Sequence, residues 1–512
     1  KEQRQLLRKA AADGMVLLKN DSLLPLDPTI KNLAVIGPNA KEAQIIGGGS
    51  ASLKPHYQSQ PLEAIKNRLS EQTNITYAKG CHTHKYLPKI EESLMGNKQG
   101  FLVEYFEGST FDKNLLVSEY LVGNKFWVFE GFAKDVIAKL ERPDISVRFS
   151  CDYIPNITGD HEFEIFGIGK ARLLINGNEI IDNWTETSPG EAFFSFSSES
   201  RKGKVKLKKD ETYKIEIQYK FEGNFPAIYI GCQTPDKVNL FEEAINAAND
   251  ADQVILIVGT NSDWETEGND RSDFNLPMNQ NHLIEEILKV NSNTIIVLNT
   301  GSPIRMPWAD KASTILQTWF AGQEFGNALT DILTGVTNPS GKLPTSFPKE
   351  LEDTPAFEYY PGDDLQMNYN ERRLVGYKWY ERKNIKPLFS FGHGLSYTQF
   401  KYSNLNVSVN ADNTVICSFF VQNIGDVIGS ETMQCYVSYI EEDLSEPLKT
   451  LQGFQKNELE AGQKNQIEIS LSSRNFATWN VNTKDWQVRP GVYEISIGSS
   501  AEDILLKANI NL

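Results

Sequence analysis

Four acidic side chains, a tryptophan and an arginine stand close together in one short segment, Asp263-Trp264-Glu265-Thr266-Glu267-Gly268-Asn269-Asp270-Arg271. Glu265 and Glu267 are separated by one residue, so both side chains point to the same side of an extended loop. Two carboxylates that face one cleft repel each other, which raises the pKa of one of them. A partly desolvated carboxyl group beside an apolar ring such as Trp264 suits proton donation to a sugar. A simpler interpretation is a solvated acidic loop with a surface pair between Asp270 and Arg271.

The elements around this segment place it at the edge of a sheet. The apolar run 254–258 predicts a buried strand, and Gly259 and Thr260 end it just before the loop. In open α/β sheets, ligands bind beyond the carboxyl ends of such strands. A second strand at 33–36 leads to a glycine-rich loop at 47–52. A dinucleotide site is the main rival for that loop, but no G-x-G-x-x-G opens a helix and no phosphate-binding Gly-Lys-Ser/Thr is present. Close backbone approach also explains the glycines.

Several further motifs follow in a fixed order. They are Asp273, Leu276-Pro277, Gln280, Asn299-Thr300-Gly301-Ser302-Pro303, Trp319 to Ala328, Pro339-Ser340-Gly341-Lys342-Leu343-Pro344, and Phe391-Gly392-His393-Gly394-Leu395-Ser396-Tyr397-Thr398. With the acidic loop, which reads W-E-x-E-G-x-D-R, they make the chain resemble family 3 glycoside hydrolases of the β-glucosidase type. The resemblance covers much of the chain.

The resemblance implies roles for individual residues. The family's general acid/base is the Glu immediately before the Gly, which corresponds to Glu267, and Glu265 becomes a supporting residue. Trp264, Glu265 and Arg271, with Gly49 and Ser50 of the glycine-rich loop, are expected to border the sugar.

The family's nucleophile is an Asp in a Ser-Asp-Trp context on a preceding (β/α)8 barrel, and that barrel is absent from this chain. Ser262-Asp263-Trp264 spells the same letters. We do not assign Asp263 as the nucleophile, because it belongs to the acid/base loop and lacks the contacts with which the barrel positions the sugar.

Between residues 96 and 236 the sequence changes to short segments in which apolar and polar residues alternate, as in strands. Asn176-Gly177 predicts a hairpin there. The run from Ile154 to Asp182 resembles the β-sandwich module named after anthrax protective antigen. This insert is interpreted either as a lid that contacts the sugar through Trp184 or Phe166, or as a packing domain. The insert contains no pair of adjacent aspartates, so calcium binding is not expected there.

The fold class expected is α/β: a mostly parallel α/β sandwich domain, interrupted by an all-β sandwich insert and followed by a fibronectin type III-like β-sandwich. The boundaries expected are 1–95 and 237–350 for the α/β domain, 96–236 for the insert, 351–400 for an aromatic connecting segment, and 401–512 for the last domain. Helices are expected at 2–18, 58–69, 239–251, 283–291 and 327–334, and strands at 76–78, 294–298 and 314–319.

The composition of the chain argues against several classes of binding partner. A net charge of −16 without a basic run argues against nucleic acid and anionic membranes, and no apolar run is long enough to span a bilayer. Five scattered cysteines show no Cys-x-x-Cys spacing, so buried thiols are favoured over a Cys417–Cys435 bridge. His82 and His84 lack a second set of ligands, so no metal is expected, and no cofactor is expected either. Residues 1–11 predict a charged helix, and the chain is expected to begin within a longer protein.

The sequence therefore predicts the acid/base-bearing part of a retaining β-glucosidase-like enzyme. Its substrate would be a β-linked oligosaccharide or glycoside, its partner a barrel domain from the same longer chain or from another chain, and its location periplasmic or secreted, as the family suggests. A homo-oligomer is compatible with the sequence. The alternative is a non-catalytic carbohydrate-binding protein or fragment built from the insert and the terminal sandwich.

Overall fold

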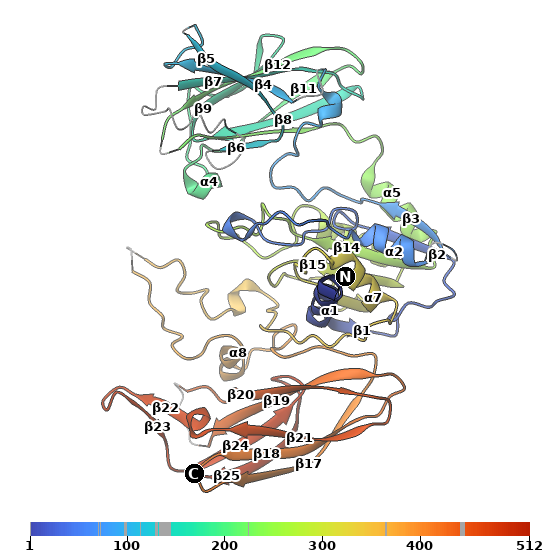
Figure 1. Cartoon of the computed structure of the whole chain (residues 1–512), viewed down its shortest axis with the longest axis vertical. Coiled ribbons are helices and arrows are strands. Elements are labelled where there is room, and N and C mark those ends of the chain that lie inside the picture. Colours follow the sequence, from blue (N-terminus) through green and yellow to red (C-terminus); the bar gives the residue numbers. More distant parts are fainter. Residues whose placement is uncertain are drawn as a thin grey trace.

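The protein, described here from a computed structural model, consists of three bodies stacked along its long axis (Figure 1). An all-β body lies at one end, an α/β body in the middle and a second all-β body at the other end. The structure describes residues 2–69, 71, 73–96, 100–112, 114–127, 132, 145–223, 225–363, 366–440 and 446–512. In these parts of the chain, none of the helices combines the length and apolar character that crossing a bilayer requires.

The middle body is built on a six-stranded sheet with the order β1-β16-β15-β14-β2-β3. All neighbouring strands are parallel except β1, which pairs antiparallel with β16 at one edge. Its strands are β1 (Val16–Asn20), β2 (Asn32–Ile36), β3 (Asn74–Ala78), β14 (Gln253–Gly259), β15 (Thr294–Asn299) and β16 (Thr314–Gln317). The predicted mostly parallel α/β domain is confirmed.

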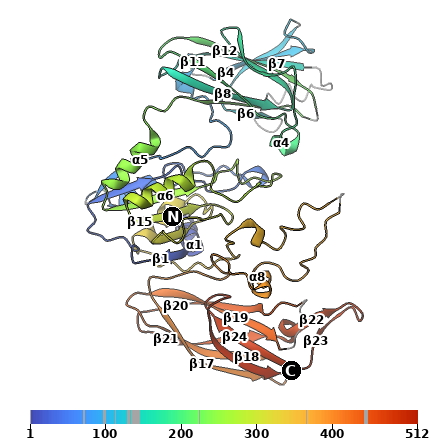
Figure 2. The ribbon, with the colours of Figure 1, turned by 180° about the vertical axis from the view of Figure 1, so that it is seen from behind.

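Helices cover both faces of this sheet. One core holds Val254, Leu256 and Val258 of β14, and the other holds Ile255 and Ile257, as the alternation of a strand buried on both faces requires. The first core contains α5 (Leu240–Asn249) and α6 (Gln280–Val290), which lie together in Figure 2, and the second contains α1 (Glu2–Gly14), α2 (Pro61–Leu69) and α7 (Phe325–Leu333). Asn239 caps α5 by accepting hydrogen bonds from the N–H groups of Phe241 and Glu242.

The helix predicted over 2–18 is wrong in its second half. The helix α1 ends at Gly14, and Val16 begins the edge strand β1. Met15, Val16, Leu17 and Leu18 are all buried, because a strand at this place puts alternate residues into both cores, whereas a helix would bury one stripe. The helical spacing of the apolar residues across 2–18 hid this change of element.

The insert is a β-sandwich of two sheets with the orders β10-β9-β12-β7-β4-β5 and β11-β8-β13-β6. Asn176 and Gly177, both with positive φ, form the two-residue turn between β9 and β10, so the predicted hairpin is confirmed. Its elements are β4 (Phe101–Glu107), β5 (Leu115–Leu121), β6 (Lys125–Trp127), β7 (Ile145–Tyr153), β8 (Gly159–Gly167), β9 (Gly169–Ile175), β10 (Asn178–Asn183), α4 (Ala192–Ser195), β11 (Arg201–Leu207), β12 (Tyr213–Phe221) and β13 (Ala227–Gln233).

The last body is a second β-sandwich, with sheets β17-β18-β21 and β20-β19-β24-β25 and a separate ribbon β22-β23. A segment that includes α8 (Tyr377–Lys383) connects it to the α/β domain. The strands are β17 (Phe400–Val409), β18 (Val415–Asn423), β19 (Gly429–Tyr439), β20 (Thr450–Leu459), β21 (Lys464–Leu471), β22 (Ala477–Asn480), β23 (Asp485–Val488), β24 (Val492–Gly498) and β25 (Ile504–Asn511). Short 3₁₀ helices occur at Gly49–Ala51, Glu92–Leu94, Leu351–Asp353 and Ser473–Phe476. All five cysteines are free and buried.

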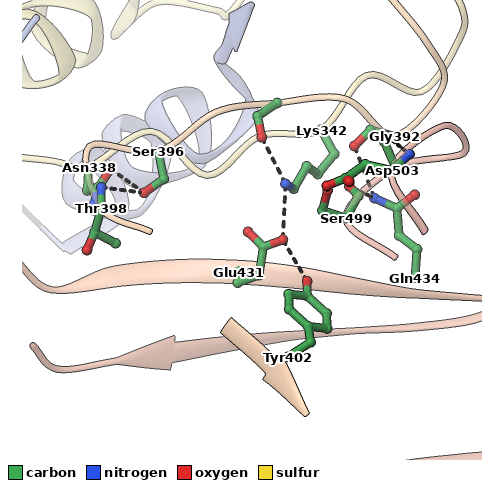
Figure 3. Close-up of polar contacts among 12 residues, drawn as sticks. Asn338, Lys342, Gly392, Ser396, Thr398, Tyr402, Glu431, Gln434, Ser499 and Asp503 are labelled. Carbon is green, nitrogen blue, oxygen red and sulfur yellow. Dashed lines mark hydrogen bonds and ion pairs between the residues drawn. The ribbon is translucent and has the colours of Figure 1, made fainter. Parts of the chain in front are cut away.

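A buried ion pair joins the α/β domain to this sandwich (Figure 3). Lys342 Nζ lies 3.3 Å from Glu431 Oε1 and donates to the carbonyl of Gly394 at 2.9 Å. Tyr402 donates its hydroxyl to the same Glu431 oxygen at 2.8 Å. Gln434 donates to the carbonyl of Gly392 at 3.0 Å. Removing one partner of such a pair leaves a buried charge uncompensated, so these contacts fix how the two bodies meet.

Candidate active site

The acidic loop leaves the sheet at the carboxyl end of β14 in a compact turn. Asn261 accepts the N–H of Asp263 on its side-chain oxygen at 2.9 Å, and its backbone carbonyl accepts the N–H groups of Trp264 at 3.1 Å and Glu265 at 3.0 Å. An Asn side chain that bonds the backbone two residues later stabilises a turn. The turn fixes the first half of the loop to the sheet.

The glycine-rich loop after β2 lies directly beside the acidic loop. Gly48 donates its N–H to the carbonyl of Glu265 at 2.9 Å and forms a parallel bridge with Thr266. A Cβ at Gly49 would lie 2.6 Å from Cβ of Glu267, and φ of Gly49 is +72°. Only glycine permits this approach, so Gly49 and its neighbour Ser50 are brought against Glu267.

Glu267 projects from this pair of loops and is exposed. Its Oε2 accepts the backbone N–H of Ser50 at 3.0 Å. Hydrogen bonds from the side chain and the backbone of Ser50 lower the pKa of Glu267, because they stabilise the carboxylate. The sequence predicts a raised pKa for one of the two glutamates, and Glu267 is not that residue in this chain. Solvent surrounds the carboxyl group here, and desolvation contributes less than Ser50 does.

Glu265 is held on every side. Its Oε1 accepts hydrogen bonds from the Thr260 hydroxyl and from the N–H of Gly301 at 3.0 Å, and its Oε2 accepts the Ser302 hydroxyl at 3.1 Å. A Cβ at Gly301 would lie 2.6 Å from Oε2, so glycine is needed for the main chain to approach. Arg271 lies close to the same group, with Nη1 3.5 Å from Ser302 Oγ. Glu265 thus ties the loop to the strand ends of β14 and β15.

Arg271 and Asp270 do not form the surface pair of the simpler interpretation. Arg271 Nη2 donates to the carbonyl of Asn275 at 2.6 Å. Burial lowers the pKa of Arg271, and the charge of Glu265 opposes that shift. Asp270 instead accepts the hydroxyl of Tyr360, from the connecting segment. Asp270 and Arg271 therefore contact different parts of the chain although they are neighbours in the sequence. Arg271 belongs to the group of residues around Glu265.

Trp264 and Asp263 face the base of the insert. The indole N–H of Trp264 donates to the carbonyl of Thr83 at 2.7 Å, and Lys85 Nζ lies 5.7 Å from the centre of its ring. Burial raises the pKa of Asp263, while the charges of Lys125 and Lys85 oppose the rise. Asp263 is thus placed among groups of the insert and its linker.

The insert reaches the acidic loop through a residue that the sequence did not single out. The short helical turn α4, in which Phe193 and Phe194 have positive φ, extends from the insert toward the α/β domain (Figures 1 and 2). Phe194, on this helix, lies so close to Gly268 that a Cβ there would be 3.3 Å from its ring. Phe194 and Phe196 are exposed to 47% and 52%, which is unusual for phenylalanine. The run Phe193-Phe194-Ser195-Phe196 was the available signal, since three of its residues are aromatic in a polar segment.

The two aromatic residues proposed from the sequence as lid contacts lie elsewhere. Phe166 is 1% exposed and stacks on Tyr229, with ring centres 4.8 Å apart, so it is part of the insert's core and the prediction is wrong. Trp184 packs against Phe111 at 6.2 Å and under the guanidinium of Arg172 at 5.2 Å, within the insert. Its role in sugar binding stays a prediction.

His82 and His84 lie where the chain passes from the α/β domain into the insert. Their rings are 5.0 Å apart, and His82 Nε2 lies 3.0 Å from Asp236 on the returning segment. Among the residues that the structure describes, no group of three or more His, Cys, Asp or Glu side chains could hold a metal ion. The histidines are therefore linker contacts in this structure.

Known families match this arrangement. Residues 15–397 match the model of the glycosyl hydrolase family 3 C-terminal domain. The chain belongs to glycosyl hydrolase family 3. Residues 431–501 match the fibronectin type III-like domain, in agreement with the prediction for the last body. The family 3 match contains the acidic loop, the glycine-rich loop and the segment that leads to the last domain.

Relatives of this family 3 chain are named β-glucosidases. The β-glucosidase of Rhizobium radiobacter is 35% identical over 525 residues, covering 100% of this chain and 63% of the relative. The probable β-glucosidase K of Emericella nidulans is 35% identical and covers 100% and 62%. A crystal structure of the β-glucosidase from Kluyveromyces marxianus in complex with glucose has a TM-score of 0.89 at 33% identity, covering 100% of this chain and 62% of that chain. The chain thus spans less than two thirds of these relatives.

Proposed function

We propose that this chain supplies the general acid/base of a retaining β-glucosidase-type hydrolase that removes terminal β-D-glucosyl residues. The observation that carries the proposal is the placement of Glu267: its backbone is fixed by the glycine-rich loop, and its carboxyl group is exposed beside Ser50. A general acid must be held in place and must reach the leaving oxygen. Glu267 would protonate that oxygen and later remove a proton from the attacking water.

The second carboxylate of the reaction belongs to a segment outside this chain. A retaining mechanism needs a nucleophile about 5 to 5.5 Å from the acid/base, and it forms a covalent glycosyl-enzyme. The surroundings of Asp263 support this division, since the carboxyl group is partly buried near the charges of Lys85 and Lys125 at the base of the insert. A barrel domain of the same longer chain or another chain would place the nucleophile opposite Glu267.

The lowered pKa of Glu267 agrees with a cleft whose opposite wall, the barrel, is missing from this chain. A general acid that works near neutral pH needs a raised pKa, which desolvation provides. In this chain Glu267 is exposed, so the hydrogen bonds from Ser50 dominate. Covering the cleft with a barrel would remove water from the carboxyl group and raise its pKa.

The insert would act as a lid over the leaving-group side of the cleft. Phe194 touches the loop at Gly268, the residue that follows Glu267, and its exposed ring offers an apolar face to a sugar or aryl group. This proposal replaces Phe166 with Phe194 as the aromatic contact. We also propose a periplasmic or secreted location, which cell fractionation tests.

Turnover of an aryl β-glucoside by the purified chain, alone and together with a family 3 barrel domain, tests the proposal. We expect no turnover by the chain alone and turnover when the barrel is supplied. Turnover by the chain alone that Asp263→Asn abolishes would place the nucleophile in this loop. Sugar binding with no turnover in either sample would favour the non-catalytic alternative.

A further inference from the structure

A cavity of about 650 Å³ lies between the α/β domain and the insert, apart from the exposed side of Glu267. Its floor is made by Asn39, Lys79 and Asn261, which follow the carboxyl ends of β2, β3 and β14. Its other walls come from both segments that connect the insert, including His84 and Thr234. The volume lies in the range of small-molecule sites in proteins.

The cavity sits at the topological switch point of the sheet. From β2 the chain moves outward to β3, and it then returns past β2 to β14, on the other side. The helix α2 after β2 and the helix α6 after β14 cover opposite faces, so a crevice opens between these two strand ends. Open α/β sheets bind ligands in this crevice. The turn that leads into the acidic loop, Asn261 and Ser262, lines the same crevice.

The lining suits a neutral ligand with many hydroxyl groups. Seven of the 24 lining residues carry a side-chain amide, among them Gln44, Gln58, Gln60 and Asn156. Glu42, Glu91 and Asp236 nearly balance Lys79 and Lys89 in charge, and the described lining contains no arginine, the residue best suited to phosphate and carboxylate groups. Amides both donate and accept hydrogen bonds, as hydroxyl groups do.

Two side chains that line this cavity, Asn39 and His84, have hydrogen-bonding capacity that no protein group among the described residues uses. Asn39 is 2% exposed, and its Oδ1 is one of the buried side-chain oxygens without a hydrogen-bond partner in the described part of the chain. Burial lowers the pKa of His84 to about 4, so its ring is neutral near pH 7 and offers one donor and one acceptor. An unpaired buried oxygen costs free energy, which a bound hydroxyl group would recover once the Asn39 side chain turns toward it.

The walls of the cavity also hold the acid/base loop. Asn261 forms the turn that precedes Glu265, and the carbonyl of Thr83 accepts the indole N–H of Trp264 at 2.7 Å. The connecting segments bear the insert, whose Phe194 touches Gly268. A ligand that bridges these walls would stabilise both the loop and the position of the insert.

We propose that this cavity is a second binding site, for a small neutral sugar, and that its occupation orders the acid/base loop and the insert. Binding at this site does not require the hydrolase activity proposed above, because all of its lining residues belong to this chain. Only the consequence for turnover depends on the proposed function.

The test is binding of D-glucose and cellobiose to the purified chain, measured by calorimetry and by hydrogen–deuterium exchange. We expect saturable binding, with reduced exchange in the segments 36–44, 79–91 and 232–236, and a smaller reduction at 259–267. The anionic sugar glucose 6-phosphate should bind no more tightly than glucose. Protection confined to 47–52 and 264–271 would place the sugar in the cleft, and absence of saturable binding would exclude the site.

A pair of matched variants localises the binding. His84→Phe fills the same space and removes the ring nitrogens, so we expect about tenfold weaker binding. His282→Phe is the control, because His282 lies on the exposed surface of α6, where its ring stacks on Phe241. Equal affinities of the two variants would overturn the assignment. The exchange pattern of the unmodified chain decides the matter if His84→Phe does not fold.

Discussion

The two halves of one acidic loop differ in what holds them. Glu265, in the first half, is tied by hydrogen bonds to Thr260, Gly301 and Ser302. Glu267, in the second half, is exposed and bonded to Ser50. A carboxylate with several partners fixes structure, whereas a carboxyl group that reaches into an open cleft can exchange a proton with a substrate. Two residues of the same type, two positions apart, are thus prepared for different tasks.

The largest expected effect separates the two glutamates by chemistry. In the chain assembled with a barrel, Glu267→Gln should lower kcat/KM for glucosides with poor leaving groups by about 10²- to 10⁴-fold, because the leaving oxygen loses its proton donor. Activated aryl glucosides should lose less in the first step. Steady-state kinetics on both substrate types measures this difference. Glu265→Gln with the larger loss, and Glu267→Gln without one, would reverse the assignment.

The next effect separates them by stability. Glu265→Ala leaves the N–H of Gly301 and the hydroxyls of Thr260 and Ser302 without their acceptor, so the chain should lose about 1 to 3 kcal/mol of unfolding free energy. Glu267→Ala should lower the unfolding midpoint much less, because the side chain is exposed and Ser50 is its bonding partner. Urea unfolding of both variants measures the difference. A chain that tolerates Glu265→Ala would show that the first half of the loop is not held by this carboxylate.

The close approach of the glycine-rich loop can be broken at Gly49. In Gly49→Ala the new methyl group meets Cβ of Glu267 at 2.6 Å, so turnover should fall about tenfold or more as Glu267 is displaced. Gly462→Ala is the matched control, since Gly462 has nearly the same φ, +76°, and no atom within 4 Å of the added Cβ. Both variants should lose about 1 kcal/mol from the left-handed backbone alone. Equal turnover in the two variants would contradict the role of the contact.

The contact with the insert should matter for the leaving group. Phe194→Ala removes the ring beside Gly268, so KM for aryl glucosides should rise about tenfold while kcat changes little. Trp184→Ala gives the comparison within the same insert. Kinetics in the assembled enzyme would show a larger effect at Trp184 if the sequence-based assignment of that residue is correct.

The smallest expected effect concerns the proton of Glu267. Ser50→Ala removes a hydrogen bond to the carboxylate, so the pKa of Glu267 should rise toward its usual value. A larger fraction of the general acid is then protonated at a given pH, and the alkaline limb of the activity profile should move upward. Carbon-13 titration of the Glu267 carboxyl group in the chain alone measures the shift directly. A fall in this pKa would show that Ser50 does not stabilise the carboxylate.

The sequence predicted secondary structure well where the apolar residues of a segment follow one periodicity. The buried runs of β14 and β15, the Asn176-Gly177 turn and the alternating strands of both sandwiches could be predicted, because each depends on burial or turn geometry over a few residues. The edge strand β1 and the helix α8 could not be predicted. Met15 and Leu18 continue the helical spacing of the apolar residues in α1, and only pairing with β16 makes Val16–Asn20 a strand.

The sequence by itself determined the order of the motifs, the family that they indicate and the candidate Glu267. The tertiary structure decided how the residues are used. It separated Glu265 from Glu267 by their partners, and it gave Arg271 to Asn275 and Ser302 instead of Asp270. It also showed that Phe194, and not Phe166, is the aromatic residue of the insert that lies against the acidic loop at Gly268. Partners far apart in the chain set burial and hydrogen bonding, and these set the pKa and the accessibility of a side chain, which no local pattern records.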